Sequence, residues 1–335
     1  GDVYTRQVWG VPGHDHELGD YSPEFWDRRL ELERRTLAEL DRLPAGTRSD
    51  DVAAGVLRER AQVEIDMIES GEHAATLNTL SSAHVFARDI FDLMPRDTAE
   101  HWNEIRQRKE AVPATLAGIR RGYFDVAERG VVGARRLALA SAEQCDAVAG
   151  ENGAFTTLAA ASETVDLTAA ARAADDAFGS FATWLRDEYA PIADPNPALG
   201  RERYRLHVRV HNGIDLDLDD AYEWGWHELH RIIERMDELA GKLHPDESRL
   251  GCIDRIKQDE RYVIEGADAF TAWSQDTIDR TLSQLDGDAF DIAKPLWTCT
   301  AMQIPSDVAV TTYYIPPSED FSRPGTVWQP TAGRD

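Results

Sequence analysis

The chain has 335 residues, of which 42% are apolar and 29% charged, so it is long enough to bury a substantial core. Its 61 acidic side chains outnumber its 36 basic ones, which gives a formal charge of -25 at pH 7. A surface this negative repels phosphate backbones and anionic lipid headgroups, so neither nucleic acid nor a membrane surface is expected as a partner.

The cysteines and the absence of long apolar runs indicate a reducing, aqueous compartment. Cys145, Cys252 and Cys299 are far apart and form no C-x-x-C pair, so we expect no disulfide framework. No apolar run approaches the roughly 18 residues that a membrane helix requires, and the first residues lack the pattern of a signal peptide. A cytoplasmic location is therefore the expectation.

Helix signals dominate the first 190 residues. Ser22-Pro23-Glu24 predicts a helix start, because a serine hydroxyl can cap backbone N–H groups and proline fits the first helical turn. Ser49-Asp50-Asp51 predicts a second start, with its acids near the positive end of the helix. Further helices are expected near 79–94, 97–110, 113–129, 133–149 and 160–190.

Three prolines between Pro191 and Pro197 end the last of these helices and predict a subdomain break at 191–200. Beyond the break, an apolar stripe predicts a helix over 218–243, with Ile232 and Met236 in the core. The stripe comprises Leu218, Tyr222, Gly225, Leu229, Ile232, Ile233, Met236 and Leu243. Another helix is expected near 267–285.

The composition changes close to position 291. The runs 296–304 and 308–315 are rich in Trp, Thr, Val and Tyr, and Pro305-Ser306-Asp307 separates them. Two β-favouring runs joined by a short turn predict an antiparallel hairpin. The proline- and glycine-rich residues that follow are expected to form a loop.

The sequence therefore predicts an all-α fold with a small antiparallel β-hairpin near the C-terminal end. We expect a helical domain at 1–290, with a subdomain break at 191–200, and the hairpin at 291–317. Residues 318–335 are expected to be a loop that leads toward a further C-terminal part.

His227 and His230 are the first candidates for metal ligands, because zinc sites on helices pair histidines about one turn apart. Their spacing is not that of the H-E-x-x-H motif. Glu223, His227, His230 and Glu234 share one face of the predicted helix, and this face lies away from the apolar stripe. A solvated polar face explains these residues better than a metal site.

Two other polar clusters have structural explanations. The acidic run 215–219 resembles the start of a calcium loop, but Asp220 and Trp226 stand where that loop requires glycine and glutamate. A helix start capped by Asp217 explains the run. His14-Asp15-His16 lies in a predicted loop and is interpreted as incidental. Because no nucleophile elbow or phosphate-binding loop is present either, we assign no catalytic and no metal-ligating residue.

The stretch 311–328 combines hydroxyls, an arginine and an indole on a predicted strand end and an irregular loop. Binding groups are commonly presented from such positions. A tyrosine hydroxyl can donate to a developing oxyanion, and an arginine can bind a carboxylate through two parallel hydrogen bonds. A hairpin that packs its aromatic side chains is the competing explanation.

The run Tyr-Tyr-x-Pro-Pro-Ser-x-Asp-x-Ser-Arg-Pro-Gly-x-x-Trp at 313–328 resembles the bacterial proteins of domain-of-unknown-function family 885. The stretch 204–236 and the helical pattern before it are compatible with that family as well. Its members are longer than this chain and similar in fold to carboxypeptidase Taq, a mostly helical zinc peptidase. Their metal motif, a His-Glu pair followed by Pro-Gly-His, comes after the segment that matches 313–328.

The resemblance implies a parent protein that hydrolyses peptides with zinc, whose ligands lie beyond Asp335. His227-Glu228 lies upstream and lacks the Pro-Gly-His continuation, so this chain alone is expected to bind no metal. The resemblance carries over Tyr313, Tyr314 and Arg323 as substrate-contact residues, with a peptide as substrate. A non-catalytic helical interaction module is the alternative, since the chain has long amphipathic helices and no complete site.

Overall fold

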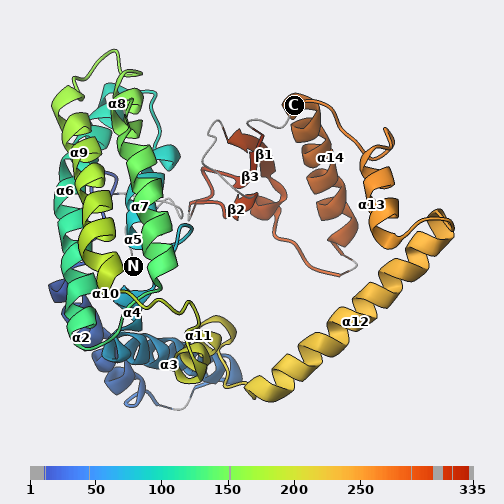
Figure 1. The fold of residues 1–335 in the computed structure, drawn as a ribbon, viewed down its shortest axis with the longest axis horizontal. Helices are drawn as coiled ribbons and strands as arrows, with labels where there is room; N and C mark the ends of the chain where they lie inside the picture. Colours follow the sequence, from blue (N-terminus) through green and yellow to red (C-terminus); the bar gives the residue numbers. More distant parts are fainter. Residues whose placement is uncertain are drawn as a thin grey trace. The chain divides into compact units, whose positions relative to one another are not determined.

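The computed structural model describes residues 11, 13–44, 46–150, 152–287, 289–304, 312–318 and 320–331. These residues form mostly α-helices and one small β-sheet near the C-terminal end, so the predicted fold class is confirmed (Figure 1). The chain divides between Leu216 and Asp217 into two compact units. The helices after position 217 cluster with the sheet, and the predicted helical domain at 1–290 stays a prediction. None of the described helices combines the length and apolarity required to cross a membrane.

The first unit is a helical bundle built around α9, which packs against both α6 and α7 (Figure 1). Its described elements are α2 (Pro23–Leu40), α3 (Arg48–Ser70), α4 (Glu72–Ala75), α5 (Ala83–Asp89), the 3-10 turn η1 (Ile90–Leu93), α6 (Ala99–Glu128), α7 (Arg135–Ala149), α8 (Ala154–Ala159), α9 (Thr168–Trp184), the π-helical turn η2 (Leu185–Tyr189), α10 (Ala190–Ile192) and α11 (Arg201–Asn212). Alanines such as Ala142 on α7 and Ala171 on α9 are fully buried. Small side chains at these positions allow neighbouring helices to approach closely.

The core of this unit contains a cluster of aromatic side chains around Trp184. Its ring centroid lies 5.1 Å from that of Phe181, 5.5 Å from that of Tyr189 and 6.1 Å from that of Tyr123. All four side chains are buried. Burying a large apolar side chain stabilises a fold by about 1.5–3 kcal/mol, so this cluster is a main source of the unit's stability.

Local signals set most of the helix starts. Ser22 accepts a hydrogen bond from the backbone N–H of Phe25 and caps α2, as predicted. The cap of α3 is Thr47, two residues before the predicted start, because Thr47 and Asp50 form a reciprocal capping box. Helix α6 continues through Pro113, which was expected to separate two helices. Its buried side chains on both sides of the proline anchor one continuous helix in the core.

Ion pairs attach α11 to α3 and α4. Glu72 is only 3% exposed, and its carboxylate accepts hydrogen bonds from Arg203 Nη2 at 3.1 Å and from His207 Nε2 at 3.0 Å. Farther along α11, Arg209 binds Glu59 through two hydrogen bonds of 2.9 and 2.8 Å. Since a buried carboxylate requires such partners, these contacts fix the position of α11 on the bundle.

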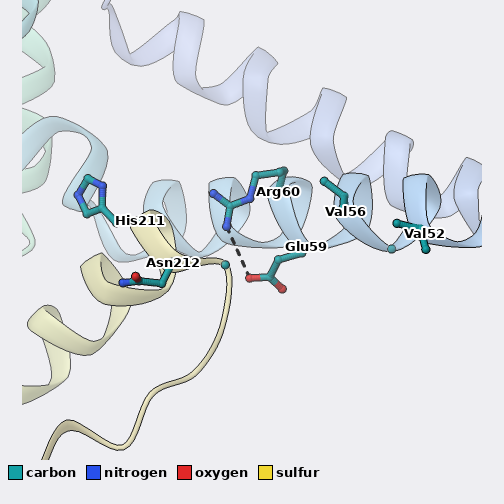
Figure 2. A pocket seen from close by; sticks show the side chains of 8 residues that line it. Val52, Val56, Glu59, Arg60, His211 and Asn212 are labelled. Carbon is teal, nitrogen blue, oxygen red and sulfur yellow. Dashed lines mark ion pairs between the residues drawn. The ribbon is translucent and has the colours of Figure 1, made fainter. Parts of the chain in front are cut away.

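A shallow groove of about 520 Å³ lies where the end of α11 meets α3 (Figure 2). Val52 and Val56 line its α3 side, and His211 and Asn212 line the other. Arg60 donates a hydrogen bond of 2.7 Å to the carbonyl oxygen of Val210. The guanidinium therefore satisfies a carbonyl at the C-terminal end of α11, which is a structural role.

The second unit contains three helices and a sheet among its described residues. Its elements are α12 (Leu218–Leu243), α13 (Arg249–Lys257), α14 (Ala267–Leu285), the 3-10 turn η3 (Lys294–Trp297), β1 (Cys299–Ile304), β2 (Tyr313–Ile315) and β3 (Gly325–Pro330). The predicted cap is confirmed, because the Asp217 carboxylate accepts hydrogen bonds from the backbone N–H groups of Asp219 and Asp220.

The predicted core position of the α12 stripe is wrong for the described residues. Ile232 is 44% exposed and Met236 is 38% exposed, and Ala240 is the buried residue of this helix. The predicted helix is present, but an apolar stripe shows only that one face of a helix is apolar and does not show that this face is buried. Nothing in the part of the chain that the structure describes buries most of this face.

The predicted hairpin is also corrected. The sheet order is β1-β3-β2, so the two runs expected to pair with each other instead flank β3. Strand β3 runs parallel to β1, with Gly325 opposite Cys299, and antiparallel to β2, with Thr326 opposite Ile315. Residues 318–335 were expected to form a loop, and β3 lies within them. Glycine and proline are unfavourable in strands, and Gly325 and Pro330 stand at the two ends of β3. The expected turn at 305–307 lies outside the described residues.

Candidate functional site

The loop between β2 and β3 is closed by hydrogen bonds to Ser318. The hydroxyl of Ser318 donates to Asp320 Oδ1 at 2.7 Å, and the backbone N–H of Arg323 donates to Ser318 Oγ at 2.9 Å. The backbone N–H of Ser318 donates in turn to the carbonyl of Arg323 at 3.0 Å. The Pro-Ser-x-Asp-x-Ser-Arg run therefore encodes a loop that holds Arg323 at a defined place.

Asp320 is the internal acceptor of this loop. Its carboxylate receives the Ser318 hydroxyl, the Ser322 backbone N–H at 3.0 Å and the Ser322 hydroxyl at 2.8 Å. These hydrogen bonds lower the pKa of Asp320 to about 2. The carboxylate is therefore ionised at neutral pH and acts as a structural acceptor.

Phe321, at the tip of the loop, has a φ angle of +57°. It is the non-glycine residue with a left-handed backbone among the described ranges, and this conformation costs about 1 kcal/mol or more. Its backbone N–H donates to the carbonyl of Ser318 at 2.9 Å, so the loop's hydrogen bonds retain the strained conformation.

The structure places Tyr314 near Arg323, and it directs Tyr313 and Tyr314 to opposite faces of the sheet. Burial raises the pKa of Tyr314 and lowers the pKa of Arg323, and each group electrostatically opposes the shift of the other. Tyr314 lies opposite Val327 on β3, whereas Tyr313 lies opposite Trp328. Because successive residues of a strand point to opposite faces, Tyr313 cannot share a site with Tyr314 on one face. Tyr314 remains 55% exposed and accessible to a ligand.

The other sequence candidates lie apart from this loop. His227 and His230 are exposed on α12, and Glu228 between them binds Arg231 with an Nε–Oε2 distance of 2.9 Å. Within the described ranges, no group of three or more His, Cys, Asp or Glu side chains is arranged to hold a metal ion. Asp217 serves as the cap of α12.

Sequence reasoning missed a pocket of about 500 Å³ in the first unit. Helices α2, α3, α4, α5 and α6 contribute to its lining, which includes Trp26, Arg29, Glu64, His73 and Tyr123. The Arg29 Nε atom lies 3.6 Å from Glu64 Oε1, although the two residues are far apart in sequence. No local sequence motif predicts this site, because the two charges meet only through the packing of α2 on α3.

Comparisons with known proteins agree with this fold. The model of the family described as "Bacterial protein of unknown function (DUF885)" matches residues 5–334. No curated protein matches the chain significantly. A solved structure described as "the putative lipoprotein from Colwellia psychrerythraea" is similar with a TM-score of 0.74 and 12% identity, over 99% of this chain. The chain spans 64% of the length of that structure, and the likeness shows the fold alone. With nearly all of its residues matched by the family model, the chain belongs to the bacterial DUF885 family.

Proposed function

We propose that this chain is the peptide-contacting part of a metal-dependent peptidase. The observation that carries the proposal is the position of Tyr314 over Gly325, two residues from Arg323, whose backbone is held by the hydrogen bond to Ser318. A phenol and a guanidinium on a rigid loop are suited to bind the two kinds of oxygen that a peptide presents, a carbonyl and a terminal carboxylate. The resemblance of 313–328 to proteins with a zinc peptidase fold supports the same reading.

The edges of the sheet support an extended substrate. On α14, the side-chain amide of Gln275 donates to the carbonyl of Cys299 at 2.9 Å and accepts from the backbone N–H of Ala301 at 2.8 Å. This amide therefore covers the outer edge of β1. Strand β2 is the opposite edge of the described sheet. An extended peptide that adds alongside β2 would run past Tyr314.

The chemistry divides between this chain and residues of the parent protein outside it. A zinc ion held by those residues would polarise the scissile carbonyl and activate a water molecule. The Tyr314 hydroxyl would donate a hydrogen bond to the oxyanion that develops on that carbonyl. Arg323 would bind the C-terminal carboxylate and so fix the register of the peptide.

The test uses the zinc-loaded parent protein and paired peptides that end in a free carboxylate or an amide. We expect Tyr314→Phe to lower kcat about 10- to 100-fold with little change in melting temperature, because it removes only a hydroxyl. Arg323→Ala should raise KM for the carboxylate peptide and leave the amide peptide unaffected. Tyr313→Phe on the opposite face and Arg280→Ala on α14 are the matched controls. If the parent protein is active and neither substitution changes kcat or KM, the proposed roles of Tyr314 and Arg323 are refuted.

The exposed face of α12 favours a second function, that of a helical interaction module. Leu229, Ile232 and Met236 lie on this face and are exposed. Acidic side chains outnumber basic ones along α12, so a second copy would be repelled and an amphipathic helix with basic flanks would be attracted. Binding of a fluorescent Leu-seamed, Lys-flanked helical peptide tests this function. Ile232→Glu should abolish binding, and His227→Glu on the polar face of α12 should not.

A further inference from the structure

The pocket in the first unit is large enough for a small organic molecule and is lined in part by aromatic side chains. Its volume of about 500 Å³ falls within the range of ordinary ligand sites. Phe25 and Trp26 meet edge to face with ring centroids 5.0 Å apart, and the Trp26 and His73 rings lie 4.6 Å apart. Tyr123 closes the α6 side. These rings offer an apolar surface with electron-rich faces.

The charges beside these rings do not balance. Arg29 Nε lies 2.9 Å from Glu33 Oε1 and 3.6 Å from Glu64 Oε1, so two carboxylates share one guanidinium. Glu33 is buried and holds the closer contact. The contact to Glu64, which lines the pocket, is longer than a hydrogen bond. Among these three groups the carboxylates therefore outnumber the guanidinium by one, and Glu64 is the one that lines the pocket. Burial raises the pKa of Glu64, and Arg29 opposes that shift.

His73 adds a hydrogen-bond acceptor rather than a positive charge. Its Nδ1 atom lies 3.2 Å from the carbonyl oxygen of Met67, and a carbonyl can only accept, so the proton resides on Nδ1. Burial lowers the pKa of His73, which keeps the ring neutral at pH 7. The second nitrogen, Nε2, therefore carries a lone pair that can accept a hydrogen bond.

We infer that this pocket binds a small primary amine with an apolar body, its ammonium group on Glu64 and its body against Trp26. A carboxylate short of one partner and an electron-rich ring both attract a cation. An anionic ligand would meet Glu64 and Glu33 with a single guanidinium between them, so it is disfavoured. This inference is independent of the peptidase proposal, because it concerns residues of the first unit alone.

The test measures binding to the whole 335-residue chain by isothermal titration calorimetry. Three probes of similar shape differ in charge: 2-phenylethylamine, 2-phenylethanol and phenylacetate. We expect the amine to bind at least about tenfold more tightly than the alcohol, and phenylacetate to show no binding. Glu64→Gln should reduce amine affinity to that of the alcohol. Glu69→Gln is the matched control, because Glu69 is an exposed carboxylate on the same helix that pairs with Arg34.

The probe series decides the matter even if the Glu64 variant fails to fold, since it uses the unmodified chain. Equal affinity for amine and alcohol would reduce the pocket to an apolar site and overturn the inference. Preferential binding of phenylacetate would show that Arg29 makes the pocket attractive to anions, and it would overturn the inference. Absence of binding by all three probes would refute a ligand site. Trp26→Leu should weaken amine binding while the chain keeps its helical content, and full retention of affinity would place the ligand elsewhere.

Discussion

The hydroxyl oxygen of Tyr314 lies over Gly325, where a methyl group on position 325 would approach it to 2.6 Å. The ring carbons of Tyr314 would lie only 3.1 and 3.2 Å from that methyl group. Gly325 begins the central strand β3 and pairs with Cys299. The glycine of the Arg-Pro-Gly run thus provides the space that the Tyr314 ring occupies.

The first prediction follows from this contact. Gly325→Ala should lower the free energy of unfolding by about 1–3 kcal/mol, because the tyrosine ring must move to admit the methyl group. In a Tyr314→Ala background the same substitution should cost much less. Gly241→Ala is the control, since open space surrounds that position on α12 and alanine favours the helix by up to about 1 kcal/mol. Equal costs in both backgrounds, measured by urea unfolding, would contradict the contact.

Local features of the fold could be predicted from the sequence, and features that depend on distant partners could not. Ser22 and Asp217 announce helix starts because their side chains bond to backbone groups two or three residues away. Strand β3 could not be predicted, because its run of β-favouring residues is short and its hydrogen bonds depend on β1 and β2. Arg29 and Glu64 meet only because α2 packs on α3.

The candidate site divides in the same way. The motif around 313–328 predicts Tyr314 and Arg323 as site residues, and the locally bonded loop between β2 and β3 places Arg323 near Tyr314. Tyr313 was grouped with them by adjacency in sequence, whereas strand alternation separates the two tyrosines. A sequence pattern thus points to the 313–328 segment, and the register of the sheet decides which of its side chains share a face.

A second prediction contrasts a core residue with an exposed one. Phe178 on α9 is 1% exposed, so Phe178→Ala should destabilise the chain by about 3–5 kcal/mol. Ile232 on α12 is 44% exposed, so Ile232→Ala should cost less than about 1 kcal/mol. Urea unfolding of both variants measures the difference. A large cost for Ile232→Ala would mean that another surface covers the α12 face in solution.

The third prediction concerns His84, which is buried in α5 with its ring 5.9 Å from that of Phe181. Burial lowers the pKa of His84 to about 4, and a contact with Gln144 opposes the shift only in part. In the unfolded chain the ring titrates near its ordinary pKa of about 6.5, so between these values the unfolded state binds more protons. Stability should therefore fall as the pH is lowered from 6.5 to 4, by about 3 kcal/mol in all.

Unfolding measured across this pH range isolates the contribution of His84. His84→Leu should flatten the dependence of stability on pH, because the variant has no buried group to protonate. The exposed His227 provides the control, and His227→Gln should retain the slope of the parent chain. An unchanged slope in His84→Leu would assign the acid sensitivity to other groups.

The last prediction addresses the anchor of α11. Burial raises the pKa of Glu72, but hydrogen bonds from His207 and Arg203 outweigh it, so the pKa is lowered overall and the carboxylate is charged at neutral pH. Glu72→Gln would leave the Arg203 guanidinium without its anionic partner at a largely buried position, at a cost of about 3–5 kcal/mol. Glu59→Gln removes a more exposed carboxylate from Arg209, which keeps Asp66 at 2.9 Å, and should cost about 1 kcal/mol or less.

Hydrogen exchange along α11 distinguishes the two variants, because loss of the anchor should release the amides of this helix before the core of the bundle opens. If the α11 amides stayed protected in Glu72→Gln, packing rather than the buried ion pair would hold the helix in place.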